Sequence, residues 1–314
     1  MKQKVGIGID IGGTSIKYGL VSSKGEIYWS AEKPTEGLTS ADIVIKNVLD
    51  AVDEVRAKAK DLNMELFTVG IGTPGLVKNA NTIVTSSNIS GWENINLGTL
   101  VSEHTGLKCF VANDADMMGL GEFTASKSHK KDTVLFITLG TGIGGALFIK
   151  GKLFQGHFGV GGELGFFPMF VNDKVRHWEE LGATSVLVKS YKKICEDAVE
   201  RNQVDGKYII QKYQEGEQNA IDCIEEMTKY IGMGLGGFIN LINPKRIVIG
   251  GGISQAGDFF IDLIKKQTEM YALKECLSGV EFQAATLGNK AGFVGAALYG
   301  LKKVKKKIVN IILN

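Results

Sequence analysis

The feature that most restricts the fold of this chain is a pattern of three short strands that occurs twice. Residues 4–30 read as a strand, a glycine turn, a strand, a Lys-Gly turn and a third strand. Residues 132–156 read the same way, with Gly140-Thr141-Gly142 in place of Gly12-Gly13-Thr14. Such a repeat in a chain of 314 residues predicts an α/β protein with two similar domains around a cleft.

Glycine is abundant, and its placement indicates loops that hold a ligand. The chain has 41 glycines against 4 prolines, without the G-X-Y period of collagen. GTGIGG, residues 140–145, fits G-x-G-x-x-G, but the strand-like ALFIKGKLF follows where a dinucleotide-binding loop needs a helix. The pattern GxxxxGK[ST] is absent. Glycine hairpins can turn backbone N–H groups toward phosphate, although they also occur without any ligand. Together with Gly250 to Gly252 after a buried strand, they favour a nucleotide site.

Asp10 ends the first strand, just before the first glycine turn. A carboxylate there is suited to hold Mg²⁺ through water, because Mg²⁺ keeps much of its hydration. The alternative is an aspartate that only caps the turn. Thr14 could donate its hydroxyl to phosphate, and Lys17 either neutralises phosphate charge or points to solvent.

The segment VANDAD places Asn113 and Asp114 at the end of another strand, over 107–116. Phosphoryl transfer to an alcohol needs a group that orients the hydroxyl and accepts its proton, and Asp114 can do both. Asp116 is a weaker candidate. The alternative for Asn113-Asp114 is an Asx turn or a helix cap without catalytic function.

Other polar groups occur in turn-rich segments. Glu163 lies among glycines, and Asn88 lies in the segment SSNISGW, so both could bind sugar hydroxyls. We expect Trp92 to pack in the structure rather than to stack on a sugar. Glu179 and Glu180 follow Trp178 and open a helix, where carboxylates are favourable in any case.

Helical periodicity predicts a helix over 39–62, a helix-rich stretch over about 174–242 and a C-terminal helix. The residues at helical spacing in the first are Ile43, Val44, Val48, Ala51, Val52, Val55 and Ala59. We predict an N-terminal domain over 1–118 that is completed by 290–314, and a larger second domain over 119–289.

Charge and cysteine content restrict the partners. The net charge is +2, so no nucleic-acid partner is expected. A lysine-rich stretch precedes the end IVNIILN, which is too short to span a bilayer. Its lysines are Lys302, Lys303, Lys305, Lys306 and Lys307. No signal peptide is apparent, and four widely spaced cysteines predict a cytoplasmic protein without disulfides. They are Cys109, Cys195, Cys223 and Cys276.

A series of motifs runs along the chain. It consists of DIGGT at 10–14, GTPG at 72–75, N-x-x-x-W at Asn88 to Trp92, NDA at 113–115, GTGIGG at 140–145, GHFGVGGELG at 156–165, NPKRIVIGGGIS at 243–254 and AGFVGAAL at 291–298. In this order they resemble the ROK family of bacterial sugar kinases and repressors. The resemblance covers nearly the whole chain and implies the actin-like ATPase (ribonuclease H-like) fold.

The resemblance also implies a function and a set of site residues. It implies ATP with Mg²⁺ as phosphoryl donor, a hexose-type acceptor, Asp114 as catalytic base and a cytoplasmic homo-oligomer, a dimer or a tetramer, of which we expect the dimer. Positions that match sugar-binding residues of the family are Asn88, Asn113, Glu163 and Glu179. Positions that match the phosphate and adenosine loops are Asp10, Gly12, Gly13, Thr14, Gly140, Thr141, Gly142, Gly251 and Gly252.

The chain departs from the family pattern in one region. Family members have a histidine after the GExG motif and a CxCGxxxC run beyond it, and these residues bind a structural zinc. Here Phe166 takes the histidine position, and 166–183 contains no cysteine. We therefore expect no zinc and a more apolar wall beside the sugar, suited to a β-glucoside aglycone or an N-acyl group, with unmodified glucose still possible. His177 is nearby but alone.

We therefore expect an ATP-dependent kinase for the 6-hydroxyl of a glucose-like sugar. One rival is a catalytically idle sugar sensor of the same fold. A second is an ATPase without a sugar acceptor. Repressors of the family carry a helix-turn-helix domain before DIGGT, where only nine residues precede Asp10 here.

Overall fold

The computed structural model describes residues 3–86, 89–126, 131–195 and 198–312, with the backbone alone at 198–200, 255 and 306–312. The chain forms two compact units. Unit 1 consists of Met1–Ser128, Leu153–Gly162 and Asn289–Asn314, and unit 2 consists of His129–Lys152 and Glu163–Gly288. These units are defined by contacts within the folded chain. The domains predicted from the sequence, with a boundary at residue 118, are units that fold independently, and that boundary stays a prediction.

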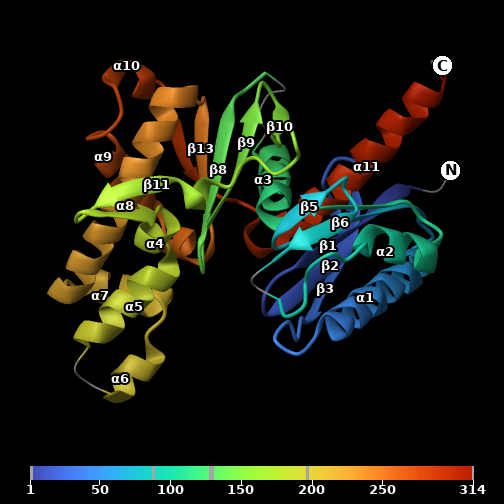
Figure 1. Ribbon diagram of the computed structural model, residues 1–314, viewed down its shortest axis with the longest axis horizontal. Helices are drawn as coiled ribbons and strands as arrows, with labels where there is room; N and C mark the ends of the chain where they lie inside the picture. The colour runs from blue at the N-terminus through green and yellow to red at the C-terminus, as the bar shows by residue number, and fades with distance from the viewer. Residues whose placement is uncertain (1–2, 87–88, 127–130, 196–197, 313–314) are drawn as a thin grey trace. The chain divides into compact units, whose positions relative to one another are not determined.

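Unit 1 contains a five-stranded sheet in the order β3-β2-β1-β4-β7 (Figure 1). Its strands are β1 (Lys4–Ile11), β2 (Ser15–Ser22), β3 (Ile27–Pro34), β4 (Glu65–Thr73) and β7 (Cys109–Asn113). Its helices are α1 (Ala41–Asp61), α2 (Leu97–Thr105), α3 (Asp114–Ala125) and α11 (Ala291–Ile312). A small hairpin, β5 (Leu76–Lys78) and β6 (Thr82–Thr85), follows β4.

The alternation of residues along β1 gives the sheet two different faces. Val5, Ile7 and Ile9 point into the hydrophobic core that contains the buried side of α1. On the other face a Cβ at Gly8 would lie only 1.9 Å from the carbonyl oxygen of Phe293 in α11. Glycine in the strand therefore allows the backbone of α11 to lie directly on the sheet.

Helix α1 confirms the predicted helix over 39–62. Ser40 is its N-cap and accepts a hydrogen bond from the N–H of Ile43. The predicted apolar positions are buried except Ile43, which is exposed. The helical spacing of apolar residues thus predicted the helix correctly. Ile43, in the first turn, lies outside the row of buried side chains on α1.

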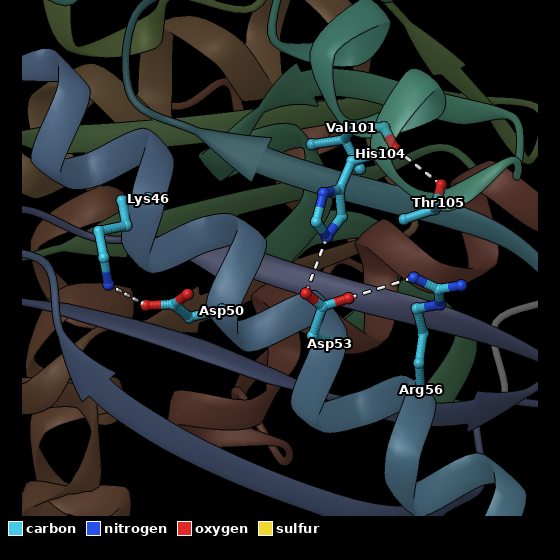
Figure 2. Close-up of polar contacts among 7 residues, drawn as sticks. All are labelled: Lys46, Asp50, Asp53, Arg56, Val101, His104 and Thr105. Carbon is cyan, nitrogen blue, oxygen red and sulfur yellow. Dashed lines mark hydrogen bonds and ion pairs between the residues drawn. The ribbon is translucent and has the colours of Figure 1, made fainter.

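Exposed ion pairs lie on α1 and between α1 and α2 (Figure 2). Asp53 contacts His104 Nε2 of α2 at 2.8 Å and Arg56 at 3.1 Å, and Lys46 pairs with Asp50 one turn earlier. Exposed pairs of this kind contribute about 0.2–1 kcal/mol each. We assign them to helix packing and not to function.

A second five-stranded sheet, which belongs to unit 2 except for Leu153 and Phe154 of β10, has the order β10-β9-β8-β13-β14. Its strands are β8 (Val134–Leu139), β9 (Ile143–Ile149), β10 (Lys152–Phe154), β13 (Arg246–Gly250) and β14 (Glu281–Ala284). In the first sheet two antiparallel pairings are followed by two parallel ones, and in the second sheet the antiparallel pair β9-β8 is followed by two parallel pairings. The two sheets therefore have corresponding strand orders, which agrees with the duplicated α/β unit that the sequence repeat predicted.

The remaining elements of unit 2 are a hairpin and a set of helices. The hairpin is β11 (Pro168–Val171) and β12 (Lys174–His177), so the helix-rich stretch predicted from about 174 begins only at Glu179. The helices are α4 (Glu179–Gly182), α5 (Thr184–Ile194), α6 (Ala198–Gln203), α7 (Gly206–Gln214), α8 (Gln218–Ile242), α9 (Asp258–Thr268) and α10 (Lys274–Leu277). The short turns are η1 (Leu164–Phe166), η2 (Gly252–Ala256) and η3 (Gly288–Lys290), of which η3 lies at the junction with unit 1. Within the described ranges of the whole chain, no helix has the length and apolar character needed to cross a bilayer.

Candidate functional site

The predicted acidic residues of unit 1 meet at the carboxyl ends of parallel strands. Asp10 on β1 is level with Gly72 on β4, and the next pair along, Thr73 and Asn113, joins β4 to β7. Asp114 follows as the first residue of α3. Ligands of open α/β sheets bind at this edge. The fold therefore brings Asp10 and Asp114 together.

Asp10 is buried with an unsatisfied oxygen. Its side chain is 3% exposed, and its Oδ1 is buried without a hydrogen-bond partner in the part of the chain that the structure describes. The carboxylate lies against α11, where a Cβ at Gly292 would come within 2.3 Å of Oδ2. A buried, unpaired carboxylate oxygen is costly and marks a place where a ligand can supply the missing contact.

The pKa of Asp10 is raised to about 7, chiefly by burial and secondly by the negative charge of Asp114, while the positive charge of Lys17 acts against both. Burial also raises the pKa of Asp114, while the N–H groups of Asp114 and Ala115 lower it. The two carboxylates therefore resist being ionised together.

We expect Asp10→Asn to stabilise the ligand-free protein more at pH 8 than at pH 5. The folded state holds the Asp10 proton up to about pH 7, whereas the unfolded chain releases it near 3.8, so stability falls as the pH rises between these values. Asparagine removes that loss, and the gain at pH 8 should be at least about 1 kcal/mol, or roughly 2–4 °C in Tm. Thermal unfolding at both pH values checks this, and an equal gain at both would contradict it.

Asn113 is both a helix cap and a neighbour of the predicted base. Its side-chain oxygen accepts hydrogen bonds from the N–H groups of Ala115 (2.9 Å) and Asp116 (3.2 Å), so the capping alternative is realised. Its Nδ2 donates to the carbonyl oxygen of Gly75 at 3.2 Å. The cap fixes the first turn of α3, and with it the position of Asp114.

We expect Asn113→Ala to lower the free energy of unfolding by about 1–2 kcal/mol, because it removes the N-cap of α3. Asn113→Ser is the matched control, since serine is also a strong N-cap residue whose hydroxyl oxygen can accept from the same N–H groups, and it adds no charge beside Asp10 and Asp114. Thermal unfolding of the two variants compares them. If Asn113→Ser were as unstable as Asn113→Ala, the cap would not be the source of the loss.

The first glycine loop of unit 1 is held by hydrogen bonds to its carbonyl groups, and its other side is exposed. Thr35 donates its hydroxyl to the carbonyl oxygen of Gly12 at 2.7 Å, and its N–H donates to the carbonyl oxygen of Thr14 at 3.0 Å. Gly13 and Thr14 are exposed. A Cβ at Gly13 would meet no other atom within 4 Å. The open side of the loop is thus accessible to an anion.

The two glycine loops predicted in unit 2 lie next to each other. Gly251 has a φ of 93°, and a Cβ there would lie 2.1 Å from the carbonyl oxygen of Leu139, directly before the loop 140–142. The side chain of Ser185 donates to Thr141 O at 2.5 Å, and its N–H donates to Gly140 O at 3.1 Å. The loop carbonyls are therefore held from α5, while Gly140, Thr141 and Gly252 are exposed.

The two predicted sugar-binding glutamates of unit 2 flank the turn η1. Glu163 directly precedes the turn and is exposed. Glu179 Oε2 accepts a hydrogen bond from the N–H of Ile143 at 3.3 Å and lies close to Gly142 and Gly165. Glu179 therefore connects the phosphate-type loop to η1, and its other oxygen, Oε1, is the one suited to a ligand hydroxyl.

Other predicted residues are found as follows. Trp92 is buried and donates its Nε1 to Thr73 Oγ1 at 2.8 Å, so it packs as expected. Lys17 is half-buried opposite Asp10 on β2. Asn88 lies outside the described residues.

Two residues in these sites were not predicted. Ser185 holds the loop 140–142, and the only signal for it is a small polar residue at the start of a helix. Gln155 Nε2 donates to the buried Asp116 Oδ2 at 3.0 Å. Asp116 is thus part of the packing between α3 and the segment 153–162. No sequence pattern predicts the contact between Gln155 and Asp116.

The residues of unit 1 fit a hydrated divalent cation. The orphaned Oδ1 of Asp10 supplies the type of ligand that Mg²⁺ prefers. Within the ranges that the structure describes, no three or more His, Cys, Asp or Glu side chains form a group that could hold a metal ion. A single carboxylate matches Mg²⁺ that is bound mainly by water and substrate phosphates.

Comparison with known proteins gives a match along most of the chain. The sequence profile of the ROK family matches residues 6–303. A glucokinase from Streptomyces coelicolor is 33% identical over 313 residues, which cover 93% of this chain and 96% of that protein. A xylose repressor from Caldicellulosiruptor bescii is 25% identical over 90% of this chain, but only 76% of the repressor is covered.

The fold has a close counterpart among solved structures. The crystal structure of a ROK family glucokinase from Streptomyces griseus, in complex with glucose and AMPPNP, matches with a TM-score of 0.82 and 30% identity. The match covers 95% of this chain and 99% of that one. The predicted actin-like ATPase fold is thereby confirmed.

Proposed function

Because the chain belongs to the ROK family, we propose that it is an ATP-dependent kinase for the 6-hydroxyl of a glucose-like hexose. The acceptor would be glucose, a β-glucoside or an N-acetylhexosamine such as N-acetylmannosamine. The glucokinase from Streptomyces griseus, whose structure holds glucose and the ATP analogue AMPPNP, supports both substrates.

The observation that carries the proposal is the position of Asp114. It stands at the first turn of α3, beside the buried Asp10, and its pKa is raised by burial. A base for an alcohol in phosphoryl transfer works best when its pKa lies closer to the working pH than that of an exposed aspartate. The surroundings of Asp114 supply that shift.

The proposed reaction assigns a different task to each group of residues. Asp114 orients the acceptor hydroxyl and takes its proton as the bond to phosphorus forms. The N–H groups of residues 12–14 and 140–142 stabilise charge on the phosphates, and Gly251 and Gly252 leave room for adenosine. Mg²⁺ bound to the ATP phosphates would neutralise part of their charge, and Asp10 would hold it through water.

The sugar would be held by hydrogen bonds in pairs. We assign its hydroxyls to Asn88, Asn113, Glu163 and Glu179. Asn113 has one Nδ2 proton left after its bond to Gly75, and Glu179 has Oε1 left after the bond to Ile143. Because Asn113 and Glu179 each make one hydrogen bond within the protein, their side chains are already oriented when the sugar binds, and this favours specificity.

We also propose that the protein acts in the cytoplasm as a homodimer, with the N-terminal domain over 1–118 and 290–314. These statements extend the family resemblance. No zinc is required in the proposed reaction.

The second candidate function is sugar sensing without catalysis, since a xylose repressor is among the relatives. Asp114 and the two intact glycine loops favour the kinase, because sugar binding without catalysis requires neither a base nor phosphate-binding loops. An ATPase without a sugar acceptor is the third possibility.

One assay separates the three functions. ADP release from Mg²⁺-ATP is measured with glucose, mannose, fructose, N-acetylmannosamine, N-acetylglucosamine, cellobiose and an aryl β-glucoside, and without sugar. A kinase releases ADP only with a sugar, an ATPase releases it without one, and a sensor binds sugar without ADP release. Sugar-independent turnover or none at all would refute the kinase proposal.

A further inference from the structure

The turn after Glu163 presents an aromatic ring to solvent. Leu164, the first residue of η1, lies in the hydrophobic core of unit 2, whereas Phe166, two residues later, is 55% exposed. Anchoring through Leu164 fixes the turn in place. The exposed phenyl ring is therefore held at the surface and not buried, so core packing does not explain it.

His177 supports this ring from a second element. The rings of Phe166 and His177 meet edge to face, with centroids 5.1 Å apart and an interplanar angle of 62°. His177 is followed by the fully buried Trp178, whose Nε1 donates to the carbonyl oxygen of Tyr230 at 2.8 Å. Because Trp178 is fixed in the core, the position of His177 is fixed as well.

The aromatic pair is adjacent along the chain to the two glutamates to which the proposed function assigns sugar hydroxyls, since Phe166 follows Glu163 in the same turn and His177 directly precedes the Trp178-Glu179 step. The backbone N–H of Phe166 donates a hydrogen bond to the carbonyl oxygen of Glu163 at 3.3 Å. A Cβ at Gly165, the neighbour of Phe166, would lie 3.0 Å from Glu179 Oε2. A sugar held by these carboxylates would thus have a phenyl ring beside it.

A phenyl ring selects a different ligand group than a carboxylate does. It offers no hydrogen bond, so a sugar hydroxyl that faced it away from water would remain unpaired. An apolar substituent gains contact in the same place, in proportion to the area that it buries. We propose that Phe166 and His177 form the contact for an apolar substituent on the acceptor, so that the preferred substrate is a hexose with an alkyl or aryl aglycone or an N-acyl group. This inference rests on the proposed kinase function.

The test compares acceptors in the full-length protein with Mg²⁺-ATP. The ratio of kcat/KM between glucose and each of phenyl β-glucoside, methyl β-glucoside, N-acetylglucosamine and N-acetylmannosamine is measured for the wild type and Phe166→Ala. We expect at least one substituted sugar to exceed glucose by about tenfold in the wild type. Phe166→Ala should lower kcat/KM for that sugar by about tenfold and change the value for glucose by less than about threefold.

Phe170→Ala is the matched control. Phe170 lies on β11 in the same segment, is 73% exposed and pairs across the hairpin with Val175. The Phe170→Ala variant therefore loses a phenyl ring of the same size as Phe166→Ala does. It should leave every ratio unchanged, and thermal unfolding of both variants verifies that they fold.

Each outcome decides the inference. A preference for phenyl β-glucoside identifies an aglycone as the substituent, and a preference for an N-acetyl sugar identifies the acyl group. If the protein phosphorylates sugars but prefers glucose, or if Phe166→Ala leaves the ratios unchanged, the inference is wrong while the kinase function stands. If no sugar is phosphorylated, the proposed function fails and the inference fails with it.

Discussion

Asp114→Asn is expected to lower kcat by about 10³-fold, while the Kd for ATP stays within about threefold of the wild type. Asparagine has nearly the same shape and can keep the bond that Asp114 Oδ1 accepts from the N–H of Ala115. It cannot accept the proton of the acceptor hydroxyl. Steady-state kinetics with the best sugar of the panel and calorimetric titration with ATP measure the two quantities.

The control lies two residues further along α3. Asp116→Asn removes a carboxylate from the same helix but keeps an oxygen that can accept from Gln155. We expect its kcat to stay within about tenfold of the wild type. Should Asp114→Asn retain most of its activity, or should Asp116→Asn be the more damaging change, Asp114 would not be the base.

The pH profile gives an independent test of Asp114. A base must be ionised to act, and burial raises the pKa of Asp114 above the ordinary value near 3.9. The acid limb of kcat/KM should therefore lie at higher pH than an exposed aspartate would give. Because Asp10 is close, this limb belongs to the pair of carboxylates.

Gly70→Ala is expected to lower the free energy of unfolding by about 3 kcal/mol or more, which is at the upper end of the cost of overpacking. A Cβ at Gly70 would lie 1.8 Å from the carbonyl oxygen of Ala296 and 2.5 Å from its carbonyl carbon. Both are backbone atoms of α11, so no side chain can rotate away. The helix would have to move off the sheet.

Hydrogen exchange followed by mass spectrometry locates this effect. Peptides from β4 and α11 should lose protection in Gly70→Ala. The control is Gly237→Ala in α8, where the added Cβ would meet no atom within 4 Å beyond the helix itself. It should stabilise α8 by about 0.5–1 kcal/mol, because alanine favours helix more than glycine does. Unchanged exchange in β4 and α11 of Gly70→Ala would contradict the tight packing.

The sequence was most informative where one pattern fixed one structure. The repeated strand and turn pattern predicted the first three strands of each sheet, because alternation and turn residues act locally. The buried face of α1 followed from its period in the same way, apart from Ile43. NDA predicted the end of an apolar strand and, as one of two alternatives, the helix cap that Asn113 forms, while the role of Asp114 as a base stays a prediction.

Other features depend on contacts between distant residues, and no local pattern contains them. The second strand of the hairpin β11–β12 lies at the start of the stretch predicted as helix-rich, and the four-residue strands are too short for a clear alternation. Ser185 and Gln155 are ordinary polar residues until the fold places them next to Thr141 and Asp116. The unsatisfied Oδ1 of Asp10 likewise results from burial by α11, far away in the sequence.

The contribution of α11 to unit 1 has a consequence for synthesis on the ribosome. The sheet face with Gly8 and Gly70 is covered by residues of α11, such as Phe293 and Ala296, so unit 1 cannot finish folding until they have been made. Unit 2 ends at Gly288 and can fold before them. The first strands to leave the ribosome would then be the last to be completed. Until α11 is made, one face of their sheet would remain uncovered, and in that interval a chaperone would matter most.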